Sequence, residues 1–352
     1  MHWKSNNFAA ITTKHVHETP QVSDSDDAED DDDEFHHQVQ QLKIEYEDDD
    51  EEDYKYEDTY NYDHHLIKIR DLKPNEIAPL QWHVTSNNPN DTENKIVTPH
   101  ALQIGLPENL QSIFLKYCQD NGIIQTFYDL LYENTIDVGS NEIRKINNKD
   151  WYIQRTDERW NSNMHWISPA NKITQDDYLD MLLNAPENDS FYQVLNAIGN
   201  KLNMDGLAAF HLTFIGVSKC DKGYLHHDFQ EVDGKAFNFI IPIITVDDGP
   251  EELHIQDDAQ FEYISSYKYK LNECIAIGDS AYHATAPCDY TSDKKMRIAA
   301  TIYVADVNED NVDNIMAYYT QYYPPNADKE YLLNMSGMHW KKKNVEYVRK
   351  KQ

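Results

Sequence analysis

The second half of the chain is a series of short β-rich runs, and this feature constrains the fold most strongly. From residue 207 onward the runs are rich in Val, Ile, Thr, Phe and Tyr, which favour β-strands. Polar turns such as CDKG (220–223) and DDGPEE (247–252) separate them. Short strands divided by turns predict a sandwich or jelly roll rather than parallel strands joined by crossover helices. The runs are LAAFHLTFIGVS (207–218), FNFIIPIITV (237–246), QFEYISSYKY (260–269), ECIAIG (273–278) and RIAATIYVA (297–305).

Helical patterns precede these strands. In PENLQSIFLKYCQ (107–119) the apolar residues Leu110, Ile113, Phe114 and Tyr117 have helical spacing. Helices followed by strands predict an α+β protein. We expect a helical or irregular part over 62–204 that packs on a β-rich core over 205–306, and a C-terminal helix with a basic tail over 307–352. The other expected helices are 123–132, 176–184 and 190–202.

The N-terminal segment 1–61 is strongly acidic. Nineteen acidic residues fall within 21–60, against Lys43 and Lys55. Like charges repel and few groups here can be buried, so the composition predicts a disordered tail. A docking segment for a basic partner is the alternative. The chain carries a net charge of −31, and because nucleic-acid binding needs a basic face, we exclude nucleic acid as a main partner.

The cysteines and the apolar runs indicate in which cellular compartment the protein is expected. The four cysteines are widely spaced and contain no CxxC pair, which is typical of a reducing compartment. The longest apolar run (237–246) has about half the length of a membrane span. The N-terminus shows no signal-peptide pattern. We therefore expect a cytoplasmic or nuclear protein with no membrane partner.

The stretch GYLHHDF (223–229) places two histidines before one aspartate. In an extended chain, residues two apart point to the same side. His226 and Asp228 therefore share one side with Tyr224, and His227 points to the other side. An imidazole and a carboxylate on one side provide two ligands of a metal site, and two histidines with one carboxylate favour non-haem Fe(II).

A third ligand is expected in GDSAYHATAP (278–287), where His283 begins an extended piece after an apolar strand. The strand RIAATIYVA then begins with Arg297. A guanidinium that enters an apolar strand needs an anionic partner. An inward-facing Arg297 is suited to binding a carboxylate through two hydrogen bonds.

Together, HHD at 226–228, His283 and Arg297 resemble the HxD…H…R pattern of Fe(II)- and 2-oxoglutarate-dependent dioxygenases. The resemblance covers residues 205–306. Within it, GYLHHD, DGKAFNFIIPI and RIAATIYVADVNE are similar to the prolyl-hydroxylase-like branch. An isolated HxD motif is weak evidence for this family. The ordered set of His226, Asp228, His283 and Arg297 on expected strands is much stronger evidence.

The resemblance implies a double-stranded β-helix (jelly-roll) core with supporting helices on one side. It implies Fe(II) held by His226, Asp228 and His283, and 2-oxoglutarate paired with Arg297. Dioxygen is then the second cosubstrate, with ascorbate as a candidate reductant. The implied reaction hydroxylates an unactivated C–H bond and releases succinate and carbon dioxide.

Departures from the family pattern leave several roles open. The loop between His283 and Arg297 is longer than usual, so Lys294 or Lys295 is an alternative carboxylate partner. Many relatives have a serine two residues after the arginine, where this chain has Ala299. Thr301 and Tyr224 are candidates to supply the missing hydroxyl, and Asn238 is a further candidate contact of the cosubstrate.

Two other function classes compete with the dioxygenase. One is a cupin-like metal-binding protein, which needs no arginine after the last histidine. The other is a non-catalytic protein that acts through its acidic tail. The sequence does not decide between a peptide substrate and a small molecule. A prolyl residue in a peptide is the first candidate. The tryptophan-rich segment 151–166 is expected to form an aromatic wall against the core, with a substrate-facing wall as the alternative.

Overall fold

The computed structural model describes residues 64–66, 71–85, 92–98, 100–133, 141–155, 162–183, 191–204, 207–229, 235–246, 249, 252–256, 264–278, 281–307 and 312–315. They all belong to one of two compact units, Tyr60–Gln352. The other unit is Met1–Thr59, so the acidic tail expected over 1–61 lies outside the described residues. Of the expected C-terminal helix and tail, only Val307 and the helical residues 312–315 are described.

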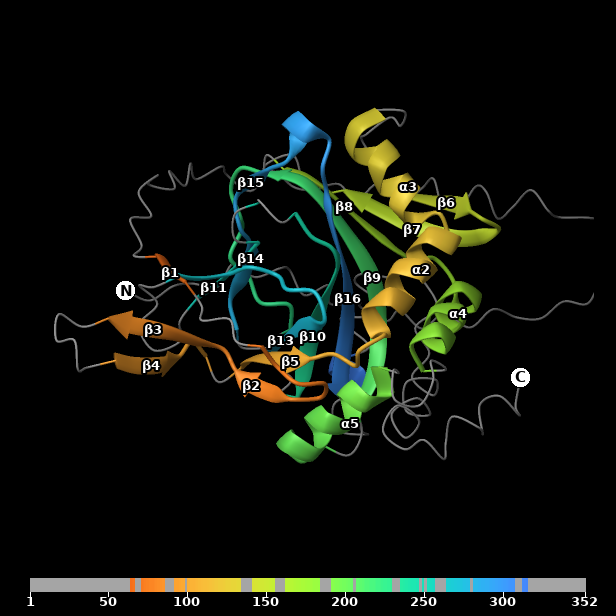
Figure 1. Cartoon of the computed structure of the whole chain (residues 1–352). Coiled ribbons are helices and arrows are strands. Elements are labelled where there is room, and N and C mark those ends of the chain that lie inside the picture. Colours follow the sequence, from red (N-terminus) through yellow and green to blue (C-terminus); the bar gives the residue numbers. More distant parts are fainter. Residues whose placement is uncertain are drawn as a thin grey trace, which may run out of the picture. The chain divides into compact units, whose positions relative to one another are not determined.

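A large antiparallel sheet is the centre of the described region (Figure 1). Four of the five β-rich runs expected from the sequence form strands of this sheet, namely β9, β10, β13 and β16. The strand order is β2 (Ile77–Pro79), β5 (Ala101–Gly105), β13 (Glu273–Gly278), β10 (Ala236–Ile244), β16 (Arg297–Asp306), β9 (Leu207–Cys220), β8 (Ser162–Pro169), β7 (Lys149–Arg155) and β6 (Glu142–Ile146), with β15 (Cys288–Asp289) paired to β9.

A second sheet of four strands contains the fifth expected run and the segment around His283. Its order is β1 (His64–Leu66), β12 (Ile264–Tyr267), β11 (Leu253–Gln256) and β14 (His283–Thr285). The β1–β12 pair is parallel and the other pairs are antiparallel. A separate hairpin joins β3 (Gln81–Thr85) to β4 (Thr92–Ile96).

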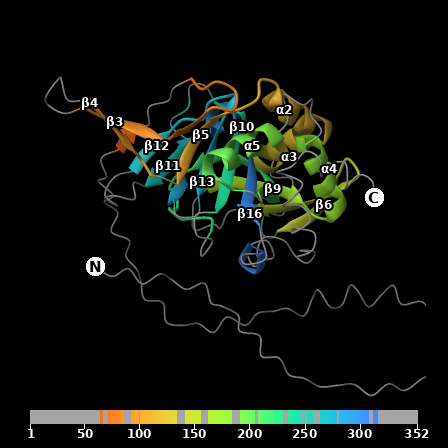
Figure 2. The same ribbon diagram turned by 90° about the horizontal axis from the view of Figure 1, so that it is seen from below.

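The helices gather on one side of the large sheet in both views (Figures 1 and 2). They are α2 (Leu110–Asp120), α3 (Ile123–Tyr128), which continues into the π-helical turn Asp129–Glu133, α4 (Lys172–Leu183) and α5 (Phe191–Leu202). These bounds confirm the four helices expected from the sequence. Among the described residues, no helix is both long and apolar enough to cross a membrane.

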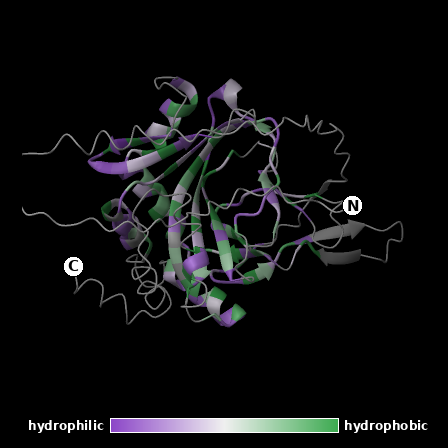
Figure 3. Ribbon diagram, turned by 180° about the vertical axis from the view of Figure 1, so that it is seen from behind, coloured by the Kyte–Doolittle hydropathy of each residue, from purple (hydrophilic) through white to green (hydrophobic). Residues whose placement is uncertain are grey.

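The alternation of side chains along the central strands separates two hydrophobic clusters. On β10, Phe239 and Ile241 pack into the cluster that includes Phe114 of α2. Ile240 points the other way and packs with Leu253 of β11. The small sheet therefore covers the face of the large sheet opposite the helices. Figure 3 shows hydrophobic stretches along the central strands and mixed colours on the helices.

The segment 62–204 contributes strands as well as helices. Its strands β6, β7 and β8 extend the large sheet beyond β9, and β5 pairs with β13. In the tryptophan-rich stretch, Trp151 is fully buried in the helix-side cluster, whereas Trp166 is half-buried on the opposite face, near Cys220 and Cys288. Trp160 lies outside the described residues.

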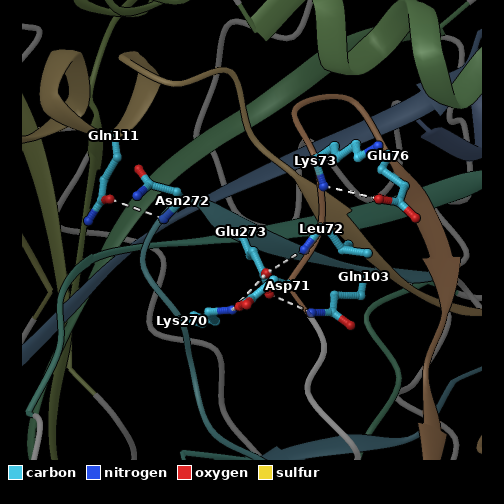
Figure 4. A network of polar contacts seen from close by, with 9 residues as sticks. All are labelled: Asp71, Leu72, Lys73, Glu76, Gln103, Gln111, Lys270, Asn272 and Glu273. Carbon is cyan, nitrogen blue, oxygen red and sulfur yellow. Dashed lines mark hydrogen bonds and ion pairs between the residues drawn. The ribbon is translucent and has the colours of Figure 1, made fainter.

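A polar network fixes the start of β13 to the segment before β2 (Figure 4). Glu273 is buried, and its carboxylate accepts hydrogen bonds from the Leu72 N–H (3.2 Å) and from the Gln103 side chain. Lys270 forms ion pairs with Glu273 (3.3 Å) and with Asp71. Both carboxylate oxygens of Glu273 are therefore satisfied, as a buried charge requires.

Candidate metal centre

The GYLHHDF segment follows β9 and lies directly against β14. The His226 N–H donates to the His283 carbonyl (3.0 Å), and the His283 N–H donates back to the His226 carbonyl (2.8 Å). A β-carbon added to Gly223 would overlap the Thr285 carbonyl. The motif segment and β14 therefore approach this closely only because residue 223 is glycine. This pairing brings the first histidine of the motif beside the expected third ligand.

The side chains of His226, Asp228 and His283 converge on one point. Their potential ligand atoms all lie within 4.8 Å of one another. The two Nε2 atoms lie 3.4 Å (His226) and 3.5 Å (His283) from different oxygens of the Asp228 carboxylate. Both distances exceed the range of a good N–H···O hydrogen bond, about 2.7–3.2 Å. They match ligands that share a metal at about 2.0–2.2 Å, whose separations are about 3.0–3.5 Å.

The backbone fixes the tautomer of both imidazoles. His226 Nδ1 lies 2.8 Å from the Tyr224 carbonyl, and His283 Nδ1 lies 3.2 Å from the Ala281 carbonyl. Because a carbonyl only accepts, each Nδ1 carries a proton, and the neutral form of each ring presents a lone pair on Nε2. Two imidazole nitrogens and one carboxylate therefore face one another, an arrangement that a bound cation would stabilise.

The electrostatics of His283 and Asp228 favour the forms that bind metal. Burial lowers the pKa of His283 to about 4, so this ring is neutral near pH 7. Burial alone would raise the pKa of Asp228, but His283, His226 and a hydrogen bond from Asn238 together lower it well below its usual value. For His226, burial is outweighed by Asp228 and the pKa is raised.

Three further residues named from the sequence support or flank this cluster. Asn238 of β10 donates from Nδ2 to Asp228 Oδ2 (2.7 Å), so it contacts a candidate ligand. The Tyr224 ring is 51% exposed and stacks on His226 with ring centroids 6.1 Å apart. His227 lies against the Tyr282 ring (4.7 Å) and is not one of the converging groups.

Arg297 begins β16 and is only 4% exposed. Its Nη1 donates to the Glu252 carbonyl (2.7 Å), and the guanidinium lies over the Tyr269 ring (5.4 Å to the centroid). A guanidinium has five N–H donors. Within the described part of the chain, one of these donors is bonded and no carboxylate forms an ion pair with Arg297. A buried cation in this state can accept an anionic ligand.

The alternative cations are placed differently. Lys294 and Lys295 are both exposed. Lys294 lies over the Tyr128 ring (6.0 Å), on the helix side, and Lys295 pairs with Asp293 (3.5 Å). Of the three cations named from the sequence, Arg297 is the one buried between the sheets.

Thr301 lies on the same face of β16 as Arg297, because the intervening Ile298 and Ala300 belong to the helix-side cluster. It is 7% exposed and pairs across the strands with Thr213 and Ile240. Ala299, between Arg297 and Thr301, packs in the cluster beneath the small sheet. The face therefore offers one hydroxyl two residues beyond the alanine.

Sequence reasoning missed three residues around these groups. Glu252 and Tyr269 contact Arg297, and His211 of β9 is buried with its ring against that of Tyr303 (centroids 4.9 Å apart). Burial lowers the pKa of His211 to about 3, although the Asp228 charge opposes this shift. Glu252 ends an acidic turn that reads as solvent-exposed, and His211 is one of sixteen histidines, so neither gave a usable signal.

Comparison with known proteins gives only distant similarity. No family model and no curated protein matches the chain. Among solved structures, the chain is similar to a 2OG-Fe(II) oxygenase family oxidoreductase from Burkholderia pseudomallei (12% identity, 53% of this chain and 79% of that chain, TM-score 0.33). It is also similar to a Pseudomonas putida prolyl-4-hydroxylase (15%, 59% and 94%, TM-score 0.35). A third is SnoN, a non-haem α-ketoglutarate-dependent epimerase from nogalamycin biosynthesis (10%, 58% and 77%, TM-score 0.36). These similarities are too low to assign the chain to a family.

Proposed function

We propose that this protein is an Fe(II)- and 2-oxoglutarate-dependent oxygenase that hydroxylates an unactivated C–H bond. The observation that carries the proposal is the combination of two groups between the sheets. One is a cluster of two imidazoles, each held through Nδ1 by a backbone carbonyl, and one carboxylate, whose potential ligand atoms converge on one point. The other is a buried arginine with unused donors. A metal site alone would not require the arginine.

In this proposal the two sheets form a double-stranded β-helix of the prolyl-hydroxylase-like kind. Two features support this: β10 and β16 pair along most of their length, and the small sheet covers their face opposite the helices. His226 and Asp228 come from the segment after β9, and His283 comes from β14. The backbone pairing of His226 with His283 thus holds together the two segments that supply the ligands.

Each residue has a defined part in the proposed site. His226, Asp228 and His283 hold Fe(II) through Nε2, a carboxylate oxygen and Nε2. Asn238 holds the Asp228 carboxylate in place through the bond to Oδ2. Arg297 binds the distal carboxylate of 2-oxoglutarate, and Thr301 offers a hydroxyl on the same face.

Bound iron with 2-oxoglutarate and dioxygen would supply the oxidising power, and succinate and carbon dioxide would be released. The chain itself orients the metal ligands and excludes water from the site. Tyr224 and Ala281 fix the imidazoles by accepting their Nδ1 protons. Buried Ile240, Ile275 and Ala299 line the space between the sheets and keep it apolar.

The substrate that we propose first is a prolyl residue in a peptide, with a free amino acid or another small molecule as the second choice. The half-exposed Tyr224 ring beside His226 is suited to contact a substrate that enters from solvent. We further propose that the acidic segment 1–61 docks a basic partner, and that ascorbate maintains the metal in its reduced state.

The proposal is tested by turnover. Protein supplied with Fe(II), 2-oxoglutarate and oxygen should form succinate slowly, and a true substrate should increase the rate. His283→Ala should abolish succinate formation, and Arg297→Met should raise the 2-oxoglutarate concentration needed for half-maximal rate at least tenfold. Succinate formation that survives His283→Ala would contradict the metal assignment. An unchanged requirement in Arg297→Met would favour a cupin-like metal site instead.

A further inference from the structure

Glu252 is an unusual neighbour for an anion-binding arginine. It precedes β11 and is only 1% exposed. Its backbone carbonyl accepts the one hydrogen bond that the Arg297 guanidinium donates among the described residues (2.7 Å). The same carbonyl also accepts the Ala286 N–H (3.1 Å). The carboxyl group of Glu252 therefore belongs to a residue whose backbone is attached directly to the guanidinium.

The Glu252 carboxyl is only half satisfied. Oε2 accepts the Tyr269 N–H (2.6 Å), whereas Oε1 is buried without a hydrogen-bond partner among the described residues. No ion pair joins it to Arg297 within 4.0 Å in the part of the chain that the structure describes. An incompletely paired buried carboxylate is costly unless a nearby cation compensates it.

Arg297 is the stronger of the two cations that act on this carboxyl. Burial raises the pKa of Glu252, and Arg297 opposes this effect more strongly than Lys268 does. Lys268 donates to the Gly249 carbonyl (3.0 Å), which directs its ammonium to the loop. The guanidinium and the Glu252 carboxyl are thus coupled through space although they do not form a direct ion pair.

We propose that Glu252 is the resident counter-charge of Arg297. It compensates the buried guanidinium while no cosubstrate is bound, and it competes electrostatically with the distal carboxylate of the cosubstrate when that group arrives. This inference rests on the proposed function, because it takes Arg297 as the anchor of 2-oxoglutarate. It makes Glu252 a positioning residue that sets cosubstrate affinity without contacting the metal.

The competition follows from charge alone. A second carboxylate beside one guanidinium places two negative charges against one positive charge in a site of low dielectric constant. Removal of the Glu252 charge should therefore tighten binding of a dicarboxylate. The same removal leaves the empty pocket with an uncompensated cation, which should destabilise the protein before cosubstrate is added.

The test is Glu252→Gln in the full chain, because the amide retains an acceptor for the Tyr269 N–H and loses only the charge. With Mn(II) as the metal and titration calorimetry as the readout, 2-oxoglutarate should bind about tenfold more tightly to E252Q than to the wild type. Without cosubstrate, E252Q should have a lower Tm. If E252Q does not fold, Glu252→Met gives the same comparison.

The matched control is Glu273→Gln, which neutralises a buried glutamate whose oxygens are fully bonded elsewhere. It should lower the Tm and leave the dissociation constant of 2-oxoglutarate unchanged. A cosubstrate analogue without the distal carboxylate, 2-oxopentanoate, should bind equally to E252Q and wild type.

Two failures are distinguishable. If the wild type binds 2-oxoglutarate and E252Q binds it equally or more weakly, the role of Glu252 is contradicted and the proposed function stands. If the Mn(II)-loaded wild type does not distinguish 2-oxoglutarate from 2-oxopentanoate, Arg297 is not the anchor, and both the role of Glu252 and that part of the proposed function fall.

Discussion

At the scale of single residues, the orientation of the candidate ligands is set by main-chain atoms. The Nδ1 atoms of His226 and His283 are held by the carbonyls of Tyr224 and Ala281, each two residues earlier in the chain. A local backbone turn therefore determines which nitrogen faces the carboxylate. Substitution of the Tyr224 or Ala281 side chain would leave these hydrogen bonds in place.

The two adjacent histidines should differ sharply when replaced. His226→Ala removes one of three converging ligands, so we expect metal affinity to fall at least a hundredfold. His227→Ala removes a ring that packs on Tyr282 and should leave metal affinity within about twofold of wild type. Titration calorimetry with Mn(II) measures the metal affinity of both variants. An equal loss in the two variants would show that the ligand assignment at this motif is wrong.

Asn238 should act on the metal through Asp228. Asn238→Ala deletes the donor to Oδ2, and loss of such a supporting hydrogen bond costs about 10- to 100-fold in metal affinity. The control is Asn163→Ala on β8, a half-buried asparagine that bonds Ser218 and the Leu131 carbonyl. It should leave metal affinity unchanged. Equal metal affinity in both variants would contradict the supporting role of Asn238.

Spacing and strand alternation predicted the residues that converge, but not their supports. His226, Asp228, His283 and Arg297 could be named because residue type and order carry the signal. Glu252 could not, because its burial depends on how the loop before β11 folds onto β16, a contact between residues 45 positions apart. The sequence predicts Asn238 as a contact of the cosubstrate, whereas in the structure its side chain donates a hydrogen bond to the Asp228 carboxylate.

At the scale of elements, two glycines allow another chain segment to approach closely: Gly216 on β9 and Gly223 just after it. Gly223 lies against the Thr285 carbonyl of β14, and a β-carbon on Gly216 would overlap the Phe127 ring of α3. Gly223→Ala should push the motif away from β14 and weaken metal binding about tenfold or more. Gly216→Ala should cost about 1–3 kcal/mol of stability by overpacking and leave metal affinity unchanged.

Metal titration and thermal unfolding of the two variants separate these effects. The Gly216→Ala variant is the control for Gly223→Ala, because each adds one methyl group beside β9. Wild-type metal affinity in Gly223→Ala would show that the approach to β14 does not position His226.

Periodicity located helices and long strands well and short strands poorly. The expected helices 107–119 and 190–202 correspond to α2 and α5, because a stripe of apolar residues packs on the sheet. Strands β11 and β14 have four and three residues, too few to show alternation. Strands β6, β7 and β8 were not expected as a group, because their partners are set by tertiary pairing with β9.

At the scale of the whole molecule, every described residue belongs to Tyr60–Gln352. We expect residues 60–352 alone to retain the Tm and metal affinity of the full chain, because the described core and the candidate ligands all lie within them. Removal of residues 1–59 followed by thermal unfolding and metal titration checks this. Loss of function on truncation, with retention of function in His226→Ala, would instead support a protein that acts through its acidic tail.

The central claim is that one pocket holds Fe(II) and a dicarboxylate together. The most direct measurement is anaerobic addition of 2-oxoglutarate to the Fe(II)-loaded protein, with the weak visible metal-to-ligand charge-transfer band as the readout. The account predicts a saturable band in the wild type, no band in Asp228→Ala, and a band in Arg297→Met only at much higher 2-oxoglutarate concentration. Absence of the band in the intact protein, or an undiminished band in Asp228→Ala, would contradict the account.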